Sequence, residues 1–534
     1  MNRFKLYQRA ILCSLMLTLP LWGTIIYVPS QYPTIQQGLN AAQYGDTVLV
    51  ASGTYPENII WPSQDGIFLM SESGPAVTAI NGSSIGRVLN FPNYSFTQNT
   101  VITGFTVENG TAEKGAGIYL YDSPYIVGNI IQRNIAQGTS TWVHGGGIFC
   151  DGTGTPRIEA NTFIGNVTRG EYWNHGAGIY VDDNVSPLII GNTFESDSAI
   201  GGYWNYGAGI YCDQGSYPDI RHNIIHSNVA TGGDRGYGVG IHAYGDCPAY
   251  ILSNLLYNNT AQSGTWNYGA GIHINSMAIV YNNTIAGNSC IGGGSNRGGG
   301  IHVYDSTNTI ANNIVVNNSA VNGGGIGGPS NAHATLMNND VWNNTGGNYY
   351  NITPGPNDIS EDPLFATGPL GDYYLSQTAA GQPQNSPCVD YGFTTAESLE
   401  LHTFTTRTDT IYDSDTVDLG YHYPTQLWVS IDEHWNMSTN GCFYTLLQAN
   451  PTLSRTGFKI SLSISQTMDI TLDVFDRLGR FIKKLHHGSI KCGYNEWIWS
   501  GHDEHGHRVP SGVYFILAKA GSSKVLSKKV ILLE

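Results

Sequence analysis

Tryptophans recur in the middle of this 534-residue chain at a spacing that suits a binding surface. The column comprises four tryptophans and one arginine: Trp142, Trp173, Trp204, Arg235 and Trp266. Tyr172 and Tyr203 stand directly before two of the tryptophans. Aromatic faces stack on the C–H faces of sugars, so a line of such rings would hold an extended polysaccharide. The rings would also gain about 0.5–1.5 kcal/mol per pair by stacking on one another, and both interpretations stay open.

A second column is acidic and consists of Asp151, Asp182 and Asp213, which are 31 residues apart. If these residues stack at strand spacing, neighbouring charges repel by about 1 kcal/mol in water and about 3–4 kcal/mol near a protein surface. A Ca²⁺ ion bound by the carboxylate oxygens would offset this repulsion. The alternative, which we favour, is that each aspartate caps the turn after its strand.

A third column changes from aromatic residues to His242, His273 and His302. Histidine clusters bind metals or act as general bases, but no pattern of Cys or Glu beside them completes a ligand set. We expect a surface stack of neutral imidazoles that replaces aromatic rings in the same column.

The columns follow from a phrase of the form Gly-x-Gly-Ile, which occurs eight times. Its isoleucines are Ile118, Ile148, Ile179, Ile210, Ile241, Ile272, Ile301 and Ile326, at intervals of 30, 31, 31, 31, 31, 29 and 25 residues. Within each repeat the apolar residues alternate with other residues, which is the period of a β-strand. The pattern therefore predicts a solenoid in which each repeat forms one coil, with equivalent residues stacked from coil to coil.

Asparagines occupy two further positions of nearly every coil. The first column is Asn129, Asn161, Asn192, Asn223, Asn254, Asn283, Asn313 and Asn339. The second column is Asn134, Asn166, Asp197, Asn228, Asn259, Asn288, Asn318 and Asn344. Asparagine tolerates left-handed backbone and can hydrogen-bond its own copy in the next coil, so we expect two internal ladders.

The glycine phrases and asparagine columns resemble the right-handed parallel β-helix of pectate-lyase-like proteins over residues 24–423. The resemblance implies an all-β fold, but it implies no single function because the fold hosts lyases, hydrolases, epimerases and adhesins. Gly53–Asn58 (GTYPEN) resembles the opening of pectin methylesterases. The catalytic phrases of those esterases and of polygalacturonases are missing from the sequence.

The N-terminal residues 1–23 are predicted to be a secretory signal, because basic residues precede an apolar run that is too short to span a membrane. Thr34 is expected to cap a short helix through Ala42 that covers the open first coil.

At the other end of the solenoid, Ile359–Pro424 resembles the closing segment of bacterial secreted β-helix proteins. We expect this closing segment to cap the last coil.

The charge balance changes near residue 450: residues 24–450 hold 33 Asp and Glu against nine Lys and Arg, whereas residues 451–534 hold seven against twelve. We interpret 424–450 as a linker and 451–534 as an antiparallel, Ig-like β-sandwich. Its phrases VFDRLGR and PSGVYF resemble the C-terminal sorting domain of type IX secretion cargo. The resemblance implies secretion and surface-attachment machinery as partners, and an extracellular or outer-surface location in a Gram-negative bacterium.

These features predict a secreted protein that binds extracellular polysaccharide through the aromatic column. One alternative is a polysaccharide lyase or glycoside hydrolase that uses the outer Tyr, Asp and His face, and another is a purely structural surface protein or adhesin. The acidic solenoid lacks the clustered cations that a nucleic acid requires. No segment after the signal is apolar enough to span a membrane, and calcium is the only cofactor that the pattern suggests.

Overall fold

The computed structural model describes residues 24–304, 307–425, 446–450, 453–454, 458–464, 468–476, 480–490, 493–520 and 524–532. The predicted signal (1–23) and most of the predicted linker (424–450) lie outside the described residues. The described residues form two compact units, one ending at residue 425 and the other beginning at residue 446. In this part of the chain, no helix combines the length and the apolar character that a membrane span requires.

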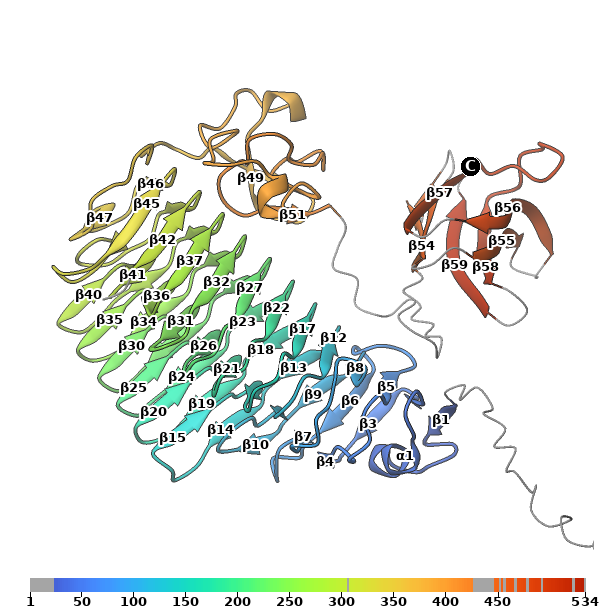
Figure 1. Ribbon diagram of the computed structural model, residues 1–534, viewed down its shortest axis with the longest axis horizontal. Coiled ribbons are helices and arrows are strands. Elements are labelled where there is room, and N and C mark those ends of the chain that lie inside the picture. Colours follow the sequence, from blue (N-terminus) through green and yellow to red (C-terminus); the bar gives the residue numbers. More distant parts are fainter. Residues whose placement is uncertain are drawn as a thin grey trace, which may run out of the picture. The chain divides into compact units, whose positions relative to one another are not determined.

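Each coil of the first unit contains up to five short strands, which pair in parallel with the equivalent strands of neighbouring coils (Figure 1). One coil runs through β16 (Ile148–Cys150), β17 (Arg157–Glu159), β18 (Thr162–Ile164), β19 (Val167–Arg169) and β20 (Trp173–His175). These strands belong to five sheets, which we name C, A, B, D and E in that order. The fold-class prediction of a parallel β-helix is therefore confirmed.

Sheets A, B and C enclose the main core. Sheet A contains β1 (Ile25–Val28), β2 (Thr47–Val50), β5 (Phe68–Ser71), β8 (Val101–Thr103), β12 (Tyr125–Val127), β17, β22 (Leu188–Ile190), β27 (Asp219–Arg221), β32 (Ala249–Leu252), β37 (Ala278–Tyr281), β42 (Asn308–Ala311) and β45 (Ala334–Met337). Sheet B contains β3 (Gly53–Tyr55), β6 (Thr78–Asn81), β9 (Thr106–Glu108), β13 (Ile130–Gln132), β18, β23 (Thr193–Glu195), β28 (Ile224–His226), β33 (Leu255–Tyr257), β38 (Thr284–Ala286), β43 (Ile314–Val316) and β46 (Asp340–Trp342). Sheet C contains β4 (Ile59–Ile60), β7 (Leu89–Phe91), β11 (Ile118–Leu120), β16, β21 (Ile179–Val181), β26 (Ile210–Cys212), β31 (Ile241–Tyr244), β36 (Ile272–Asn275), β41 (Ile301–Val303), β44 (Ile326–Gly327) and β47 (Tyr349–Tyr350).

Sheets D and E form a second, thinner layer, which we call the fin. Sheet D contains β10 (Thr111–Ala112), β14 (Ile135–Gln137), β19, β24 (Ser198–Ile200), β29 (Val229–Thr231), β34 (Thr260–Gln262) and β39 (Ser289–Cys290). Sheet E contains β15 (Trp142–His144), β20, β25 (Trp204–Tyr206), β30 (Arg235–Tyr237), β35 (Trp266–Tyr268) and β40 (Ser295–Arg297). Small residues such as Ala199, Ala208 and Ala230 pack in its interior. The side chains on the opposite face of sheet E therefore point out of the fin.

The Gly-x-Gly phrase carries the chain from sheet E into sheet C at a sharp corner. Gly145 has φ +63°, and a Cβ atom there would lie 2.7 Å from the Cβ of Phe149. Only glycine adopts this conformation at such a close approach without strain. The isoleucines that end the phrases pair in register, for example Ile148 with Ile179, and are fully buried. The predicted stacking of repeats is confirmed at these positions.

Both predicted asparagine ladders are present inside the solenoid. In the first, the Asn161 amide nitrogen Nδ2 donates to Asn192 Oδ1 at 3.1 Å, and Asn192 Nδ2 donates to Asn223 Oδ1 at 3.0 Å. Each Oδ1 also accepts a backbone N–H, as Asn192 Oδ1 does from Asn161 at 2.9 Å. The buried polar groups at these corners are thus hydrogen-bonded to the neighbouring coil, as buried polar groups in proteins generally must be.

The N-terminal end is covered as predicted. Helix α1 (Ile35–Ala41) begins at Thr34, whose side chain accepts the Gln37 N–H at 3.2 Å. The Glu57 carboxylate accepts two more free N–H groups of the first turn, from Ile35 at 2.8 Å and Gln36 at 2.9 Å. Because α1 buries its apolar face against β1 and β2, the first coil does not present an open core.

The closing segment (Ile359–Pro424) contacts the last coil, which it was predicted to cap, and also extends beyond it. Its first residues meet that coil, where Ile359 pairs with Asp340. Farther along the segment, Cys388 Sγ donates to the Asp340 carboxylate at 3.3 Å, and the Tyr391 carbonyl accepts from Asn338 at 2.9 Å. The remainder, with β48 (Phe365–Gly368), β49 (Gly371–Leu375), the 3-10 helices η1 (Thr378–Ala380) and η2 (Glu397–Leu399), β50 (Phe404–Thr405) and β51 (Tyr423–Pro424), folds back along the flank (Figure 1). It buries outward residues of sheets A and B, such as Leu252 and Leu255. These apolar outward positions are the sequence signal for a covering segment.

The second unit consists of two small, mainly antiparallel sheets. One contains β52 (Leu446–Asn450), β54 (Phe458–Ile464) and β57 (Gly493–Trp499). The other contains β53 (Leu453–Ser454), β55 (Met468–Asp476), β56 (Phe481–Ile490), β58 (Gly512–Ala520) and β59 (Lys524–Leu532). Trp499 from the first sheet and Ile516 from the second share one core. This arrangement agrees with the predicted sandwich.

Asp197 is the one acidic rung of the second asparagine ladder, and we predict that Asp197→Asn stabilises the protein. Its Oδ1 accepts from Asn166, but its buried Oδ2 has no partner among the described residues. Burial raises the pKa of this carboxyl well above its ordinary value of 3.8. The folded protein therefore loses stability as the pH rises from 3.8 toward the raised pKa. An amide would supply the missing donor and add about 1–3 kcal/mol at pH 7, with a much smaller gain at pH 3.

Chemical denaturation of both proteins at the two pH values measures this effect. Asn228→Asp, which places a second carboxyl on the neighbouring rung, serves as the matched control and should destabilise the fold at pH 7. A less stable Asp197→Asn variant at pH 7 contradicts the account.

Candidate functional site

The predicted tryptophan column lies in one line on the outer face of sheet E. The register pairs Trp142 with Trp173, Trp173 with Trp204, Trp204 with Arg235 and Arg235 with Trp266. Trp142 is 42% exposed, and the other three tryptophans are partly exposed. Six residues were predicted to bind a ligand. The structure aligns four of them, the tryptophans, on β15, β20, β25 and β35, with Arg235 on β30 between the last two. The other two, Tyr172 and Tyr203, directly precede Trp173 and Trp204 in the sequence.

The indoles are in contact with one another but do not form a flat sheet. Ring centroids are 3.8 Å apart for Trp142 and Trp173 at an interplanar angle of 55°, and 4.2 Å apart for Trp173 and Trp204 at 65°. Tyr203 meets Trp204 edge-on at 5.6 Å and is 49% exposed. Tyr172 is 51% exposed. The column is therefore a ridged aromatic surface whose rings contact one another, as the stacking interpretation predicted. The sugar-binding interpretation stays a prediction.

Arg235 continues the column as a cation between two indoles. Its guanidinium carbon lies 5.2 Å from the Trp204 ring centroid and 4.5 Å from that of Trp266. Asp234 approaches Arg235 Nε at 3.7 Å. Cation–π contacts of this kind fix a guanidinium over an aromatic face. The flat guanidinium therefore fills the place of a ring without interrupting the line.

Beneath the tryptophans, two aromatic columns fill the concave corner between sheets E and C, which we call the aromatic corner. Its sheet E column is His144, His175, Tyr206, Tyr237 and Tyr268, and its sheet C column is Phe149, Tyr180, Tyr211, His242, His273 and His302. Rings of the two columns pack together, as His175 does on Tyr211 with centroids 4.4 Å apart. The corner is thus a second core, outside the barrel of sheets A, B and C.

The expectation of a surface stack of histidines is wrong in its exposure. His242 and His302 are fully buried, and His273 is 2% exposed. Burial lowers the pKa of His273 to about 3 and those of His242 and His302 well below the ordinary value. The imidazoles are therefore neutral, as expected, but they lie under other rings where solvent does not reach. The sequence does not reveal this because the angle between sheets E and C decides the burial.

The three aspartates cap turns, which is the alternative that the sequence favoured. Asp151 Oδ1 accepts the Gly152 N–H at 2.8 Å, Asp182 Oδ1 accepts from Asp183 at 3.1 Å, and Asp213 Oδ1 accepts from Gln214 at 2.7 Å. Tyr119 and Tyr211 also donate hydroxyls to Asp151 and Asp213. Burial, followed by the charges of the neighbouring aspartates, raises the pKa of Asp182 to about 6.

Among the described residues, Asp151, Asp182 and Asp213 do not form a group whose carboxylate oxygens lie close enough together to share one metal ion. Within the described ranges, the group of three His, Cys, Asp or Glu residues whose ligand atoms lie within 4.8 Å of one another is Asp390, Asp413 and Asp418. These residues belong to the closing segment, and sequence reasoning did not single them out. Asp413 Oδ2 meets His422 Nε2 at 2.7 Å, and Asp418 accepts the Asp390 N–H at 2.7 Å. The group is therefore an internally bonded network that fixes the segment.

The buried histidines make the aromatic corner sensitive to acid, and His175→Tyr tests this. Burial lowers the pKa of His175 to about 3, whereas an unfolded histidine titrates near 6.5. The unfolded chain therefore binds more protons below pH 6.5, and stability falls by about 1.4 kcal/mol per pH unit as the pH drops toward 3. Tyrosine occupies the same column in the next coil at Tyr206. The variant should lose this part of the acid dependence.

Denaturation midpoints between pH 7 and pH 4 measure the effect. Tyr206→His is the reciprocal control and should steepen the acid dependence. Superimposable profiles of the parent and His175→Tyr proteins contradict the assigned role of burial.

Two family models match parts of the chain: the right handed beta helix region over residues 146–345 and the periplasmic copper-binding protein (NosD) over residues 34–205. Among solved structures, the PL6 family alginate lyase AlyGC is similar at 12% identity with a TM-score of 0.31, over 68% of this chain and 56% of that chain. The chain thus spans about half the length of that lyase. No curated protein matches the sequence. The first match supports the right-handed form of the β-helix that the sequence predicted.

Proposed function

We propose that the protein is exported and binds an extracellular polysaccharide along the tryptophan column. The observation that carries the proposal is the register of sheet E, which aligns Trp142, Trp173, Trp204 and Trp266 with Arg235 on five neighbouring strands. Partly exposed indoles in one line offer apolar faces to successive sugar rings of an extended chain. The glycan itself is not identified by these residues.

The rigidity of this surface supports binding, because few side chains need to be ordered when a ligand arrives. Trp204 packs at the edge of the aromatic corner, beside the buried rings of Tyr206 and Tyr211. Asn174 and Asn205 hydrogen-bond inside the fin at 3.1 Å and hold β20 and β25 in register. Preorganised aromatic groups lose little conformational entropy on binding.

A lyase or hydrolase that uses the outer Tyr, Asp and His face is less well supported. General acid–base catalysis requires groups within hydrogen-bond reach of the substrate. His242, His273 and His302 are buried in the aromatic corner, and Asp182 is 8% exposed.

A structural or adhesive role without a glycan ligand is separated from our proposal by the binding experiment below.

The second matched family is described as copper-binding, but the geometry of the histidine column does not fit a copper site. His242 Nε2 and His273 Nδ1 lie 2.9 Å apart in a hydrogen bond. His273 and His302 are stacked with ring centroids 5.0 Å apart and an interplanar angle of 4°, so their in-plane lone pairs lie in separate parallel planes and do not converge on one ion. Copper prefers imidazole and sulfur ligands, whereas the cluster of Asp390, Asp413 and Asp418 offers carboxylates alone.

The location outside the cytoplasm and the role of the second unit belong to the same proposal. The order of sequence phrases in residues 451–534 supports a sorting role for this unit. The periplasmic family that matches residues 34–205 is compatible with passage through the cell envelope. Secretion machinery would then be the partner of the second unit, and a polysaccharide the partner of the first.

Retention on a panel of immobilised polysaccharides, with and without Ca²⁺, tests the proposed function. We expect the full chain to bind at least one glycan without releasing new reducing ends or unsaturated products. Trp173→Ala combined with Trp204→Ala should weaken binding by about tenfold or more, because each stacking contact is worth about 0.5–1.5 kcal/mol. A triple variant with Asp151→Asn, Asp182→Asn and Asp213→Asn should bind the glycan as strongly as the parent protein.

The matched control is Tyr217→Ala, because Tyr217 is 58% exposed in the loop between β26 and β27 and lies outside the column. This control should retain full binding. Absence of retention on every glycan, or equal loss in the control and the double variant, contradicts binding by the column. Cleavage of a glycan supports the enzymatic alternative instead.

A further inference from the structure

One line of contacts between the closing segment and the β-helix follows a column of corner residues between sheets A and B. These residues share a left-handed backbone with φ between 49° and 65°: Ala160, Gly191, His222, Ser253, Asn282, Asn312 and Asn338. Ser253 Oγ accepts the His422 N–H at 3.0 Å, and Asn282 Nδ2 donates to the Asp418 carbonyl at 2.7 Å. The polar members of the column thus hold the segment to the flank.

Along the corner, the last such contact toward the N-terminal end is that of His222, whose ring stacks on Phe404 with centroids 3.9 Å apart and an interplanar angle of 8°. The next two corner residues toward the N-terminal end are Gly191 and Ala160. Neither has a polar side chain that could bind the segment. The small corner residues beyond His222 therefore leave a space between the corner and the closing segment.

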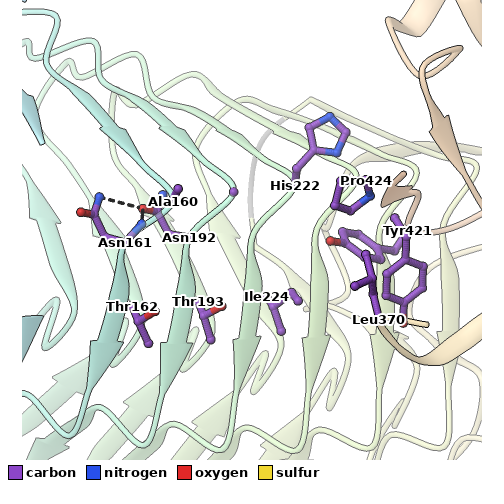
Figure 2. A pocket seen from close by; sticks show the side chains of 12 residues that line it. Ala160, Asn161, Thr162, Asn192, Thr193, His222, Ile224, Leu370, Tyr421 and Pro424 are labelled. Atoms are coloured by element: carbon purple, nitrogen blue, oxygen red, sulfur yellow. Dashed lines mark hydrogen bonds between the residues drawn. The ribbon is translucent and has the colours of Figure 1, made fainter. Parts of the chain in front are cut away.

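A cavity of about 210 Å³ occupies this place, as Figure 2 shows from close by. Thr162 and Thr193, which pair in register on β18 and β23, form one wall together with Ile224. Leu370 and the aromatic residues Tyr421 and Tyr423 of the closing segment form the other wall. The asparagine ladder directly behind Thr162 and Thr193 holds the first wall rigid.

The chemistry of the lining selects a ligand class. The twelve lining residues include no Lys, Arg, Asp or Glu, so an ionic ligand would lose hydration without gaining a partner. Threonine hydroxyls both donate and accept hydrogen bonds, and they face aliphatic and aromatic side chains across the cavity. Burial lowers the pKa of His222 to about 3, which keeps this wall uncharged at neutral pH. A cavity of this volume takes one ring rather than a chain.

We propose that this cavity binds a single neutral, hydroxylated ring, such as one hexose unit. Its ring face lies against the apolar wall, and its hydroxyls exchange hydrogen bonds with Thr162 and Thr193. The site is independent of the tryptophan column, because sheet B, the corner between sheets A and B, and the closing segment build it, whereas the column lies on sheet E.

Titration of the full chain with glucose, galactose, mannose and N-acetylglucosamine, followed by saturation-transfer NMR and calorimetry, tests the proposal. At least one of these sugars should bind saturably, and glucuronate should bind at least about tenfold more weakly. Thr193→Phe fills the cavity from an outward strand position and should abolish binding. Thr193→Val replaces the hydroxyl with a methyl group of similar size and should weaken binding by about fivefold.

Thr335→Phe is the matched control, since Thr335 is an exposed threonine on the outer face of β45, away from the cavity. It should bind the sugar like the parent protein, as should Trp173→Ala combined with Trp204→Ala. The proposal is overturned if no neutral sugar binds, if a folded Thr193→Phe variant still binds, or if the tryptophan variant loses binding instead.

Discussion

The hydrogen bond from one asparagine amide to the next is the interaction on which this solenoid depends. At the first ladder, Asn254 Nδ2 donates to Asn283 Oδ1 at 3.0 Å, and Asn283 Nδ2 donates to Asn313 Oδ1 at 3.0 Å. A shift of register by one residue would break these bonds in a buried corner, where unpaired polar groups are costly. The ladders therefore fix which residue of one coil lies above which residue of the next.

Fixed register turns a sequence repeat into surface columns, and the outcome depends on the curvature at each position. Where sheets E and C meet in a concave corner, outward side chains such as Tyr180 and His242 cover one another and become a second core. At the outer part of sheet E, the tryptophans remain partly exposed. The same coil-to-coil stacking of equivalent residues thus produces the buried aromatic corner and, next to it, the partly exposed tryptophan column.

Much of this organisation could be predicted from sequence because it depends on spacing alone. The pairing of Trp173 with Trp204, the ladder through Asn161 and the helix cap at Thr34 all follow from local patterns. The burial of His242 could not be predicted, because it depends on the angle between two sheets. The course of the closing segment along the flank could not be predicted either, since it results from contacts such as Asn282 with Asp418 that are far apart in the sequence.

The dependence of affinity on oligosaccharide length tests most directly whether the aligned indoles act as one extended surface. For a glycan that the protein retains, calorimetric titration with a series of purified oligosaccharides gives a dissociation constant for each length. We predict that affinity rises with every added sugar until the ligand spans the strands from Trp142 to Trp266, and then levels off. An affinity that is the same for the shortest and the longest member of the series contradicts it.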